Sequence, residues 1–132
     1  MLIISLKTDQ PTAEIGLYKD RKQLDHLSWL ADRSLSSTIH QKIAAILESN
    51  DLALKDLDGI LIYKGPGSFT GLRIGFSVAN ALAYALQVPV VAEGGGHNSW
   101  LKLGLRRLEN GQNEQLALPN YGAEPHITKP RK

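Results

Sequence analysis

The chain has 132 residues, 42% of them hydrophobic and 21% charged, which is typical of one globular domain. It contains no cysteine, which excludes disulfides, a thiolate nucleophile and a cysteine-ligated metal. A net charge of +2 is too small to indicate nucleic-acid binding on its own. No apolar run is long enough to span a bilayer, and Met1-Leu2-Ile3-Ile4 lacks the pattern of a signal peptide, so we expect a cytoplasmic protein without a membrane partner.

Three strands are expected first, followed by helices alternating with strands. Short apolar runs between turn residues predict strands over residues 2–7, 12–19 and 23–30. Apolar residues at helical spacing then predict an amphipathic helix over residues 35–50. A strand over 59–63, a helix rich in Ala and Leu from 76 to 87 and a short strand over 88–92 follow. After Gly94-Gly95-Gly96 we expect a basic helix over 97–109, and then an extended tail from 118 to 132.

This order of elements, β-β-β-α-β-α-β, predicts the fold class. Strands joined by short turns form an antiparallel meander, whereas strands separated by helices pair parallel through right-handed crossovers. The expected α/β fold is a mixed five-stranded sheet with helices, a single ribonuclease-H-like lobe as in the actin, sugar-kinase and Hsp70 superfamily. We expect this lobe over residues 1–93, the Gly-rich break and basic helix over 94–110, and a Pro-containing extended tail over 111–132.

The stretch KGPGSFTGLRIG, residues 64–75, joins the fourth strand to the second helix. Gly67 permits a strained turn, and Ser68 or Thr70 can accept hydrogen bonds from the free N–H groups that begin the helix. Because a helix N-terminus can bind phosphate, Gly67, Ser68 and Thr70 are candidate phosphate-binding residues. The spacing matches neither a Walker A loop nor G-x-G-x-x-G, so a purely structural turn and an association surface remain alternatives.

The association surface is suggested by a strip of small residues along the second helix. Gly71, Gly75, Ala79 and Ala83 recur every four residues and therefore lie on one side of the helix. A strip without long side chains allows another backbone to come close, either that of a partner or that of this chain. In the partner interpretation, Gly75→Leu or Ala79→Leu would prevent pairing and leave the monomer folded.

Residues 64–75, continuing through Ala79, Ala81, Leu82 and Ala83 into Val88-Pro89-Val90, resemble the signature of the bacterial TsaB family, formerly called YeaZ. The resemblance covers residues 1 to about 93, and the stretch 119–129 is faintly similar to the family's extreme C-terminus. It implies a scaffold role in making threonylcarbamoyladenosine (t6A) in tRNA. The implied partners are TsaD, the catalytic paralogue, and TsaE, an ATPase, and tRNA is contacted only indirectly.

The resemblance also implies where partners bind. Family members pair with TsaD, or with a second copy of themselves, through the two helices of the N-terminal lobe. The expected interface therefore contains Gly71, Gly75, Ala79 and Ala83, together with Arg73 on the same helix and Ile39 and Ile43 on the preceding one.

Two departures from the family argue against catalysis. The first strand of TsaB-like chains usually ends in an Asp-Thr-Ser turn, but Leu6 stands at the position of the acid here, with Asp9 nearby. A leucine cannot hold Mg²⁺, which needs oxygen ligands. The stretch from Gly94 to Leu118 is too short for a second lobe, which would be needed to enclose a nucleotide. We therefore expect no catalytic residue, no metal and no cofactor, and interpret the lone His40 as a surface or interface residue.

Two further functions remain open. A tRNA-contacting accessory protein would use Lys102, Arg106 and Arg107 of the third helix, with Lys129, Arg131 and Lys132 of the tail, as phosphate contacts. A residual nucleotide-dependent enzyme would instead lose its ATP turnover with Asp9→Ala or Ser68→Ala.

Overall fold

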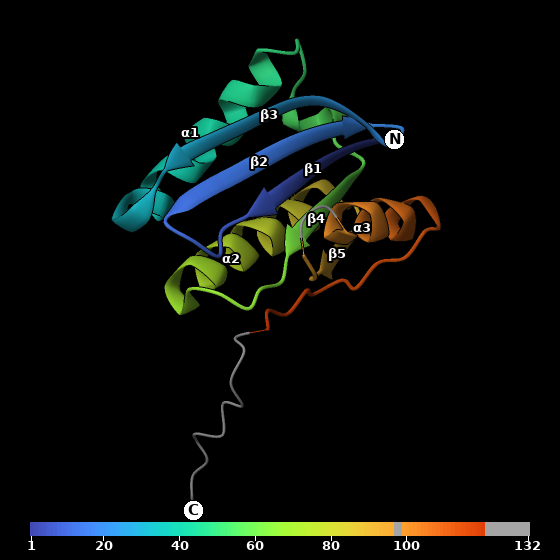
Figure 1. The fold of residues 1–132 in the computed structure, drawn as a ribbon. Helices are drawn as coiled ribbons and strands as arrows, with labels where there is room; N and C mark the ends of the chain where they lie inside the picture. The colour runs from blue at the N-terminus through green and yellow to red at the C-terminus, as the bar shows by residue number, and fades with distance from the viewer. Residues whose placement is uncertain (97–98, 121–132) are drawn as a thin grey trace, which may run out of the picture.

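The computed structural model describes residues 1–96 and 99–120, which form one sheet with helices on both of its faces (Figure 1). The strands are β1 (Leu2–Lys7), β2 (Thr12–Lys19), β3 (Lys22–Leu30), β4 (Gly59–Tyr63) and β5 (Val90–Glu93). Their order in the sheet is β3-β2-β1-β4-β5. The β1, β2 and β3 strands pair antiparallel, whereas β1–β4 and β4–β5 are parallel pairs. The predicted mixed five-stranded sheet is confirmed.

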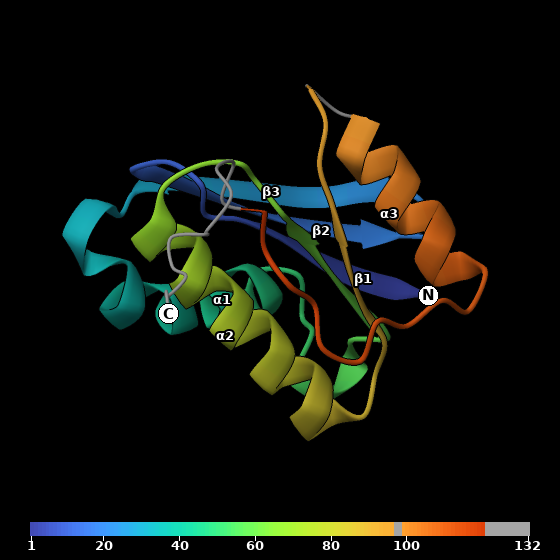
Figure 2. The same cartoon turned by 90° about the horizontal axis from the view of Figure 1, so that it is seen from below.

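Two helices cover one face of the sheet and a third covers part of the other (Figure 2). The helices are α1 (Leu35–Glu48), α2 (Phe69–Leu86) and α3 (Ser99–Glu109), with short 3-10 turns at Asp32–Ser34 and Leu54–Asp56. The α3 helix lies over β4 and β5 and leaves the same face of β1, β2 and β3 largely uncovered. None of the described helices is long and apolar enough to cross a membrane.

The α2 helix begins at Phe69, seven residues before the Ala- and Leu-rich stretch and directly after Ser68, one of the two predicted capping residues. The Ser68 hydroxyl accepts a hydrogen bond from the Gly71 N–H at 3.2 Å, so Ser68 is the N-cap. Gly71 and Gly75 therefore lie inside the helix, as the predicted strip of small residues requires. The β5 strand begins at Val90 rather than at residue 88. Positions 97 and 98 of the predicted third helix, and the tail from residue 121 with His126, lie outside the described residues.

The core consists of two clusters, one on each face of the sheet. Strand residues alternate between them: Ile4 of β1 faces the larger cluster beneath α1 and α2, whereas Ile3 and Leu61 face the smaller one beneath α3. Trp100, Leu105 and Leu108 of α3 complete the smaller cluster. The α3 helix, which the sequence sets apart from residues 1–93, is thus packed directly on the sheet of the lobe.

The segment after α3 is bonded to β5, the edge strand of the sheet, and then to α2. The Glu114 N–H donates to the Val90 carbonyl at 2.9 Å, and the Asn113 side chain accepts from the Val90 N–H at 3.1 Å. The side chain of Asn80 on α2 exchanges two hydrogen bonds with the backbone of Ala117, at 3.0 and 2.9 Å. The described part of the predicted tail is therefore bonded to the lobe and closes one of its sheet edges.

Candidate functional site

The loop before α2 is bonded to the turn between β1 and β2. The Ser68 N–H donates to the Asp9 carbonyl at 2.8 Å, and a side chain at Gly67 would overlap the Cβ of Asp9. Gly65 has a φ of 92°, a conformation that side chains disfavour. Of the candidate phosphate residues, Ser68 caps the helix and Gly67 fits closely against Asp9, whose carboxylate would repel an anion. Thr70 is exposed in the first turn of α2.

The strip of small residues faces the interior of this chain. A Cβ at Gly71 would overlap the carbonyl oxygen of Thr8, and one at Gly75 would overlap the Thr8 hydroxyl. Ala79 and Ala83 are 0% and 5% exposed. The prediction that this strip is bare for a neighbouring protein is wrong, because the end of β1 and its following turn already occupy it.

The buried isoleucines of α1 need the same correction. Ile39 and Ile43 are 0% and 3% exposed and belong to the core between α1 and the sheet. Only Arg73 of the seven expected interface residues is exposed, and its guanidinium lies 5.5 Å from the centre of the Phe69 ring. For the same reason, Gly75→Leu and Ala79→Leu would disrupt the core rather than a surface.

The opposite, outward side of α2 forms one exposed surface with α1, which we call the outer helix face. Its exposed residues on α1 are small or polar: Ser36, Ser37, His40, Gln41, Ala44, Ala45 and Glu48. Those on α2 are Phe69, Thr70, Arg73, Ser77, Ala81, Tyr84 and Ala85. A shallow groove of about 240 Å³ separates the two helices, with Ser36 and His40 on one side and Arg73 and Ser77 on the other.

This outer helix face is poor in charge and carries exposed aromatic rings. Glu48 and Arg73 are its only Asp, Glu, Lys or Arg residues. Tyr84 is 81% exposed and Phe69 56% exposed. A solvated helix face usually carries many charged residues, so this surface is unusual for a helix that only faces water. The sequence alone does not reveal this surface, because the scarcity of charge on one side of a helix can be recognised only once its buried side is known.

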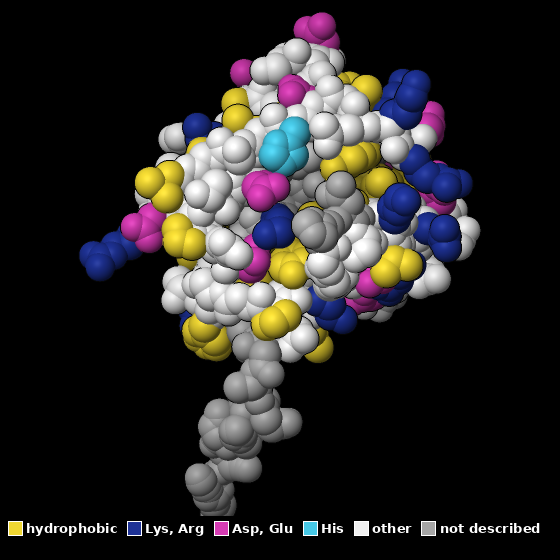
Figure 3. Space-filling model, in the orientation of Figure 1, with side chains coloured by type: hydrophobic (Ala, Val, Ile, Leu, Met, Phe, Trp, Pro, Cys, Tyr) yellow, Lys and Arg dark blue, Asp and Glu magenta, His cyan; other side chains and the backbone are white. Residues whose placement is uncertain are grey.

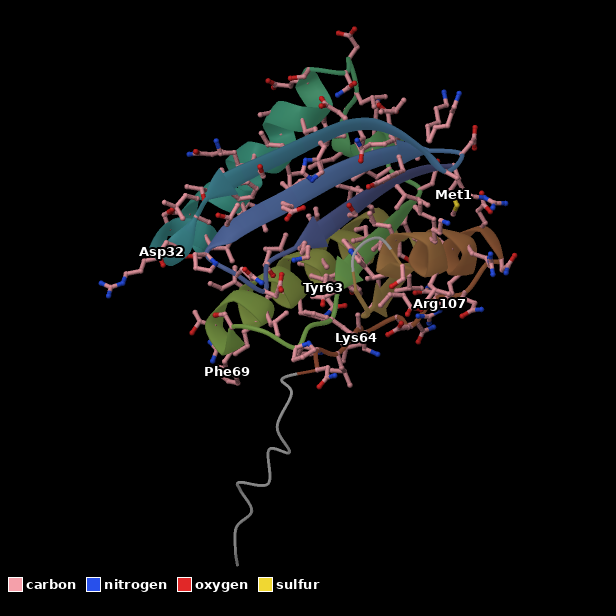
Figure 4. All side chains as sticks on the ribbon, viewed as in Figure 1. Met1, Asp32, Tyr63, Lys64, Phe69 and Arg107 are labelled. Carbon is pink, nitrogen blue, oxygen red and sulfur yellow. The ribbon has the colours of Figure 1, made fainter. Side chains whose placement is uncertain are left out.

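The position of the missing acid is occupied by a core residue. Leu6 is fully buried between the sheet and the helices. Asp9 is 6% exposed, and its carboxylate accepts a hydrogen bond from the Lys7 ammonium at 2.9 Å. Lys7 also lies 4.8 Å from the centre of the Tyr63 ring, at the end of β4 (Figure 4). The described residues contain no group of three His, Asp or Glu that could hold a metal ion.

Two charged side chains, those of Asp58 and Arg107, have structural bonds within the lobe. Asp58 accepts a hydrogen bond from the Leu2 N–H at 2.8 Å. Arg107 of α3 forms ion pairs with Glu93 at 2.8 Å and Glu114 at 2.9 Å. Burial works against the charge on Arg107, but the hydrogen bonds to these carboxylates outweigh it and raise its pKa. Arg107 therefore ties α3 to β5 and to the segment after it.

The fold defines the class of protein as a single α/β lobe of the actin and sugar-kinase type, and three comparisons identify the family. The family model described as "TsaD: tRNA N6-adenosine threonylcarbamoyltransferase" matches residues 29–93. A relative from Haemophilus influenzae, named "tRNA threonylcarbamoyladenosine biosynthesis protein TsaB", is 33% identical over 69% of this chain. A relative of the same name from Bacillus subtilis is 32% identical over 70% of it.

A solved structure, "YeaZ from Pseudomonas aeruginosa", superposes with a TM-score of 0.66 and 29% identity over 70% of this chain. The chain belongs to the TsaB (YeaZ) family, as its loop and helix residues 64–83 lead one to expect. It spans about two fifths of the relatives' length: 38% and 40% of the two TsaB proteins and 43% of the YeaZ chain.

Proposed function

We propose that this chain is a non-catalytic scaffold subunit in the formation of t6A in tRNA. It pairs with a TsaD-like catalytic paralogue through the outer helix face and supports recruitment of a TsaE-like ATPase. The same face serves pairing with a second copy when the paralogue is absent. The role is cytoplasmic, and contact with tRNA is indirect. The support is the similarity to proteins named TsaB over about 70% of the chain, together with the character of the outer helix face.

The single observation that carries the pairing surface is the small number of charged side chains among the exposed residues of two neighbouring helices. Small side chains such as Ser77 and Ala81 give a flat surface that a second pair of helices can approach closely. The exposed ring of Tyr84 offers the kind of anchor that is enriched in protein interfaces. Arg73 is the one cation on α2 and supplies a contact that can select a partner with a complementary acid.

The non-catalytic assignment is supported at the end of β1. In this superfamily an acid there handles phosphate and metal, whereas this chain has Leu6, which supplies no oxygen ligand and is fully buried. The nearby Asp9 is bonded to Lys7 and lies close to the Gly67 backbone.

Co-purification with a TsaD-like protein tests the pairing surface. Ser77→Arg and Ala81→Arg place a long cation on the outer helix face at exposed helical positions, so both variants are expected to fold and to lose the complex. The matched control is Ala53→Arg, an exposed position whose hydrogen bonds with Asp56 use its backbone N–H and carbonyl. Normal pairing by both outer-face variants would contradict the assignment. Restoration of t6A in a strain lacking its own TsaB provides the functional readout.

A second candidate function is direct contact with tRNA through α3. Lys102 and Arg106 are exposed on this helix, and basic side chains gather over it in Figure 3. Arg107, the third cation of the predicted contact, is held by Glu93 and Glu114, which removes it from this role. A steep fall of tRNA binding with salt, reduced by Lys102→Ala combined with Arg106→Ala, would favour direct contact over the scaffold role.

A further inference from the structure

A polar pocket lies on the face of the sheet opposite the outer helix face, on the half that α3 leaves uncovered. It has a volume of about 420 Å³, within the range of small-molecule sites. Lys7, Glu14, Tyr18 and His26 line it from the strands, and Trp100 borders it from α3. Figure 3 shows His, acidic and basic side chains gathered at the centre of this face. The pocket is separate from the proposed scaffold surface, and the inference below does not depend on that role.

The floor of the pocket is built by close packing around a glycine. Tyr18 lies across Gly16, where a Cβ would come within 2.8 Å of the Tyr18 ring and 2.7 Å of the Ser5 hydroxyl. Tyr18 is 6% exposed, and its hydroxyl donates to the Gln23 side chain at 3.2 Å. A phenol on a merely solvated sheet face would turn outward, whereas this one is held flat by its neighbours. The floor therefore presents fixed polar atoms to the pocket.

The walls hold more negative than positive charge. Asp9, also 6% exposed, binds the Lys7 ammonium through one carboxylate oxygen at 2.9 Å. Glu14 and His26 are 3.1 Å apart, with side chains about two-fifths exposed. Two carboxylates, those of Asp9 and Glu14, face the single ammonium of Lys7, so the pocket offers an anion little net attraction. Phosphate-bearing ligands are therefore poor candidates for this pocket.

We propose that this pocket binds an uncharged ring that carries neighbouring hydroxyl groups, either a free sugar or the ribose of a nucleoside. A carboxylate such as that of Glu14 can accept hydrogen bonds from two adjacent hydroxyls at once, and bonds to an ionised acceptor are the stronger kind. The Gln23 amide adds further donors and acceptors. Tyr63 and Trp100, edge to face with ring centres 5.3 Å apart, supply an aromatic wall for the apolar side of the ligand.

Titration of the intact chain with four probes tests this proposal: adenosine, 2′-deoxyadenosine, methyl β-D-ribofuranoside and AMP. Adenosine is expected to bind and to shift the amide signals of Gly16 and Gln23. Loss of the 2′-hydroxyl is expected to weaken binding about tenfold, and the phosphate of AMP is expected to weaken it as well. Binding of the riboside as tight as that of adenosine identifies a sugar site, and tighter binding of adenosine identifies a nucleoside site.

Two variants locate the binding. Glu14→Ala is expected to reduce adenosine affinity about tenfold, and Gln23→Ala, at an exposed position, gives a second test if the first variant folds poorly. Glu48→Ala, an exposed acid on α1 across the sheet, is the matched control and should bind normally. The proposal is overturned if AMP binds more tightly than adenosine, if the deoxynucleoside binds equally well, or if Glu14→Ala and Gln23→Ala change nothing. It is equally overturned if no probe binds at about 10 mM.

Discussion

Replacing Gly75 by alanine tests whether the strip of small residues belongs to the core. In an exposed helix this change would stabilise the protein by about 1 kcal/mol, because alanine is the better helix former. Here the new methyl group would overlap the Thr8 hydroxyl and lie 3.1 Å from the Thr8 Cβ and Cγ2. Thr8 is 1% exposed and has little room to move. Overpacking of this kind costs about 2–3 kcal/mol, so the expected net loss of stability is about 1–2 kcal/mol.

Urea denaturation followed by circular dichroism measures this loss, which corresponds to a melting temperature lower by about 3–6 °C. Ser77→Ala, on the exposed side of the same helix, is the matched control and should be neutral or slightly stabilising. Thr8→Ala should rescue Gly75→Ala, because it removes the overlapping hydroxyl. It should not rescue Gly71→Ala, whose methyl group meets the Thr8 carbonyl oxygen. A Gly75→Ala protein as stable as Ser77→Ala would refute the packing argument.

Three further outcomes are expected. Asn80→Ala removes both hydrogen bonds to Ala117, so amide hydrogen exchange should become faster in residues 113–117 and the free energy of unfolding should fall by about 1–3 kcal/mol. The control Gln115→Ala should change neither quantity much. Burial raises the pKa of Tyr18 above its usual value of 10, against the effect of the Ser5 hydroxyl. Tyr18 therefore contributes fully to the free energy of unfolding below about pH 10, and this contribution is lost as the pH rises through its folded-state pKa. Tyr18→Phe should reduce the loss of stability that urea denaturation measures between about pH 9 and 11. Tyr84→Ala should leave stability unchanged, since the ring is 81% exposed. The same change should weaken pairing with a TsaD-like protein by about 2 kcal/mol in a binding titration, and an unaltered affinity would exclude Tyr84 as an interface anchor.

The sheet could be predicted from the sequence because each strand has a clear local signal. Alternation in β2 and the apolar runs of β1 and β4 fix which segments are strands, and the lengths of the connections fix which pairs are parallel. The Ala- and Leu-rich stretch from residue 76 marks only the second part of α2, because Gly71 and Gly75 reduce helix propensity, whereas in the folded chain Ser68 caps the helix before them. Propensity was overridden by a cap and by contacts with Thr8, which is far away in the sequence.

The segment along β5 could not be foreseen from any periodic pattern. Only part of its pairing with β5 is backbone to backbone, and the side chains of Asn113 and Glu114 supply the remaining acceptors for the N–H groups of Val90 and Ala92. A segment that pairs with a strand partly through its side chains need not alternate apolar and polar residues in its sequence. Arg107, which holds the segment in place, looks in the sequence like any solvated cation of a basic helix.

The strip on α2 shows what small residues in a helix do and do not establish. Glycine every fourth residue indicates that a backbone comes close, but it does not say which backbone, and the Thr8 turn of this chain satisfies the requirement. Both the strip and the bulky side with Leu72 and Phe76 are consequently directed inward. The outward side of α2 carries Arg73 as the one cation of this 18-residue helix, and the packing of the monomer does not explain why it has so few charged residues. The case for a partner on the outer helix face therefore depends on missing charges rather than on missing side chains.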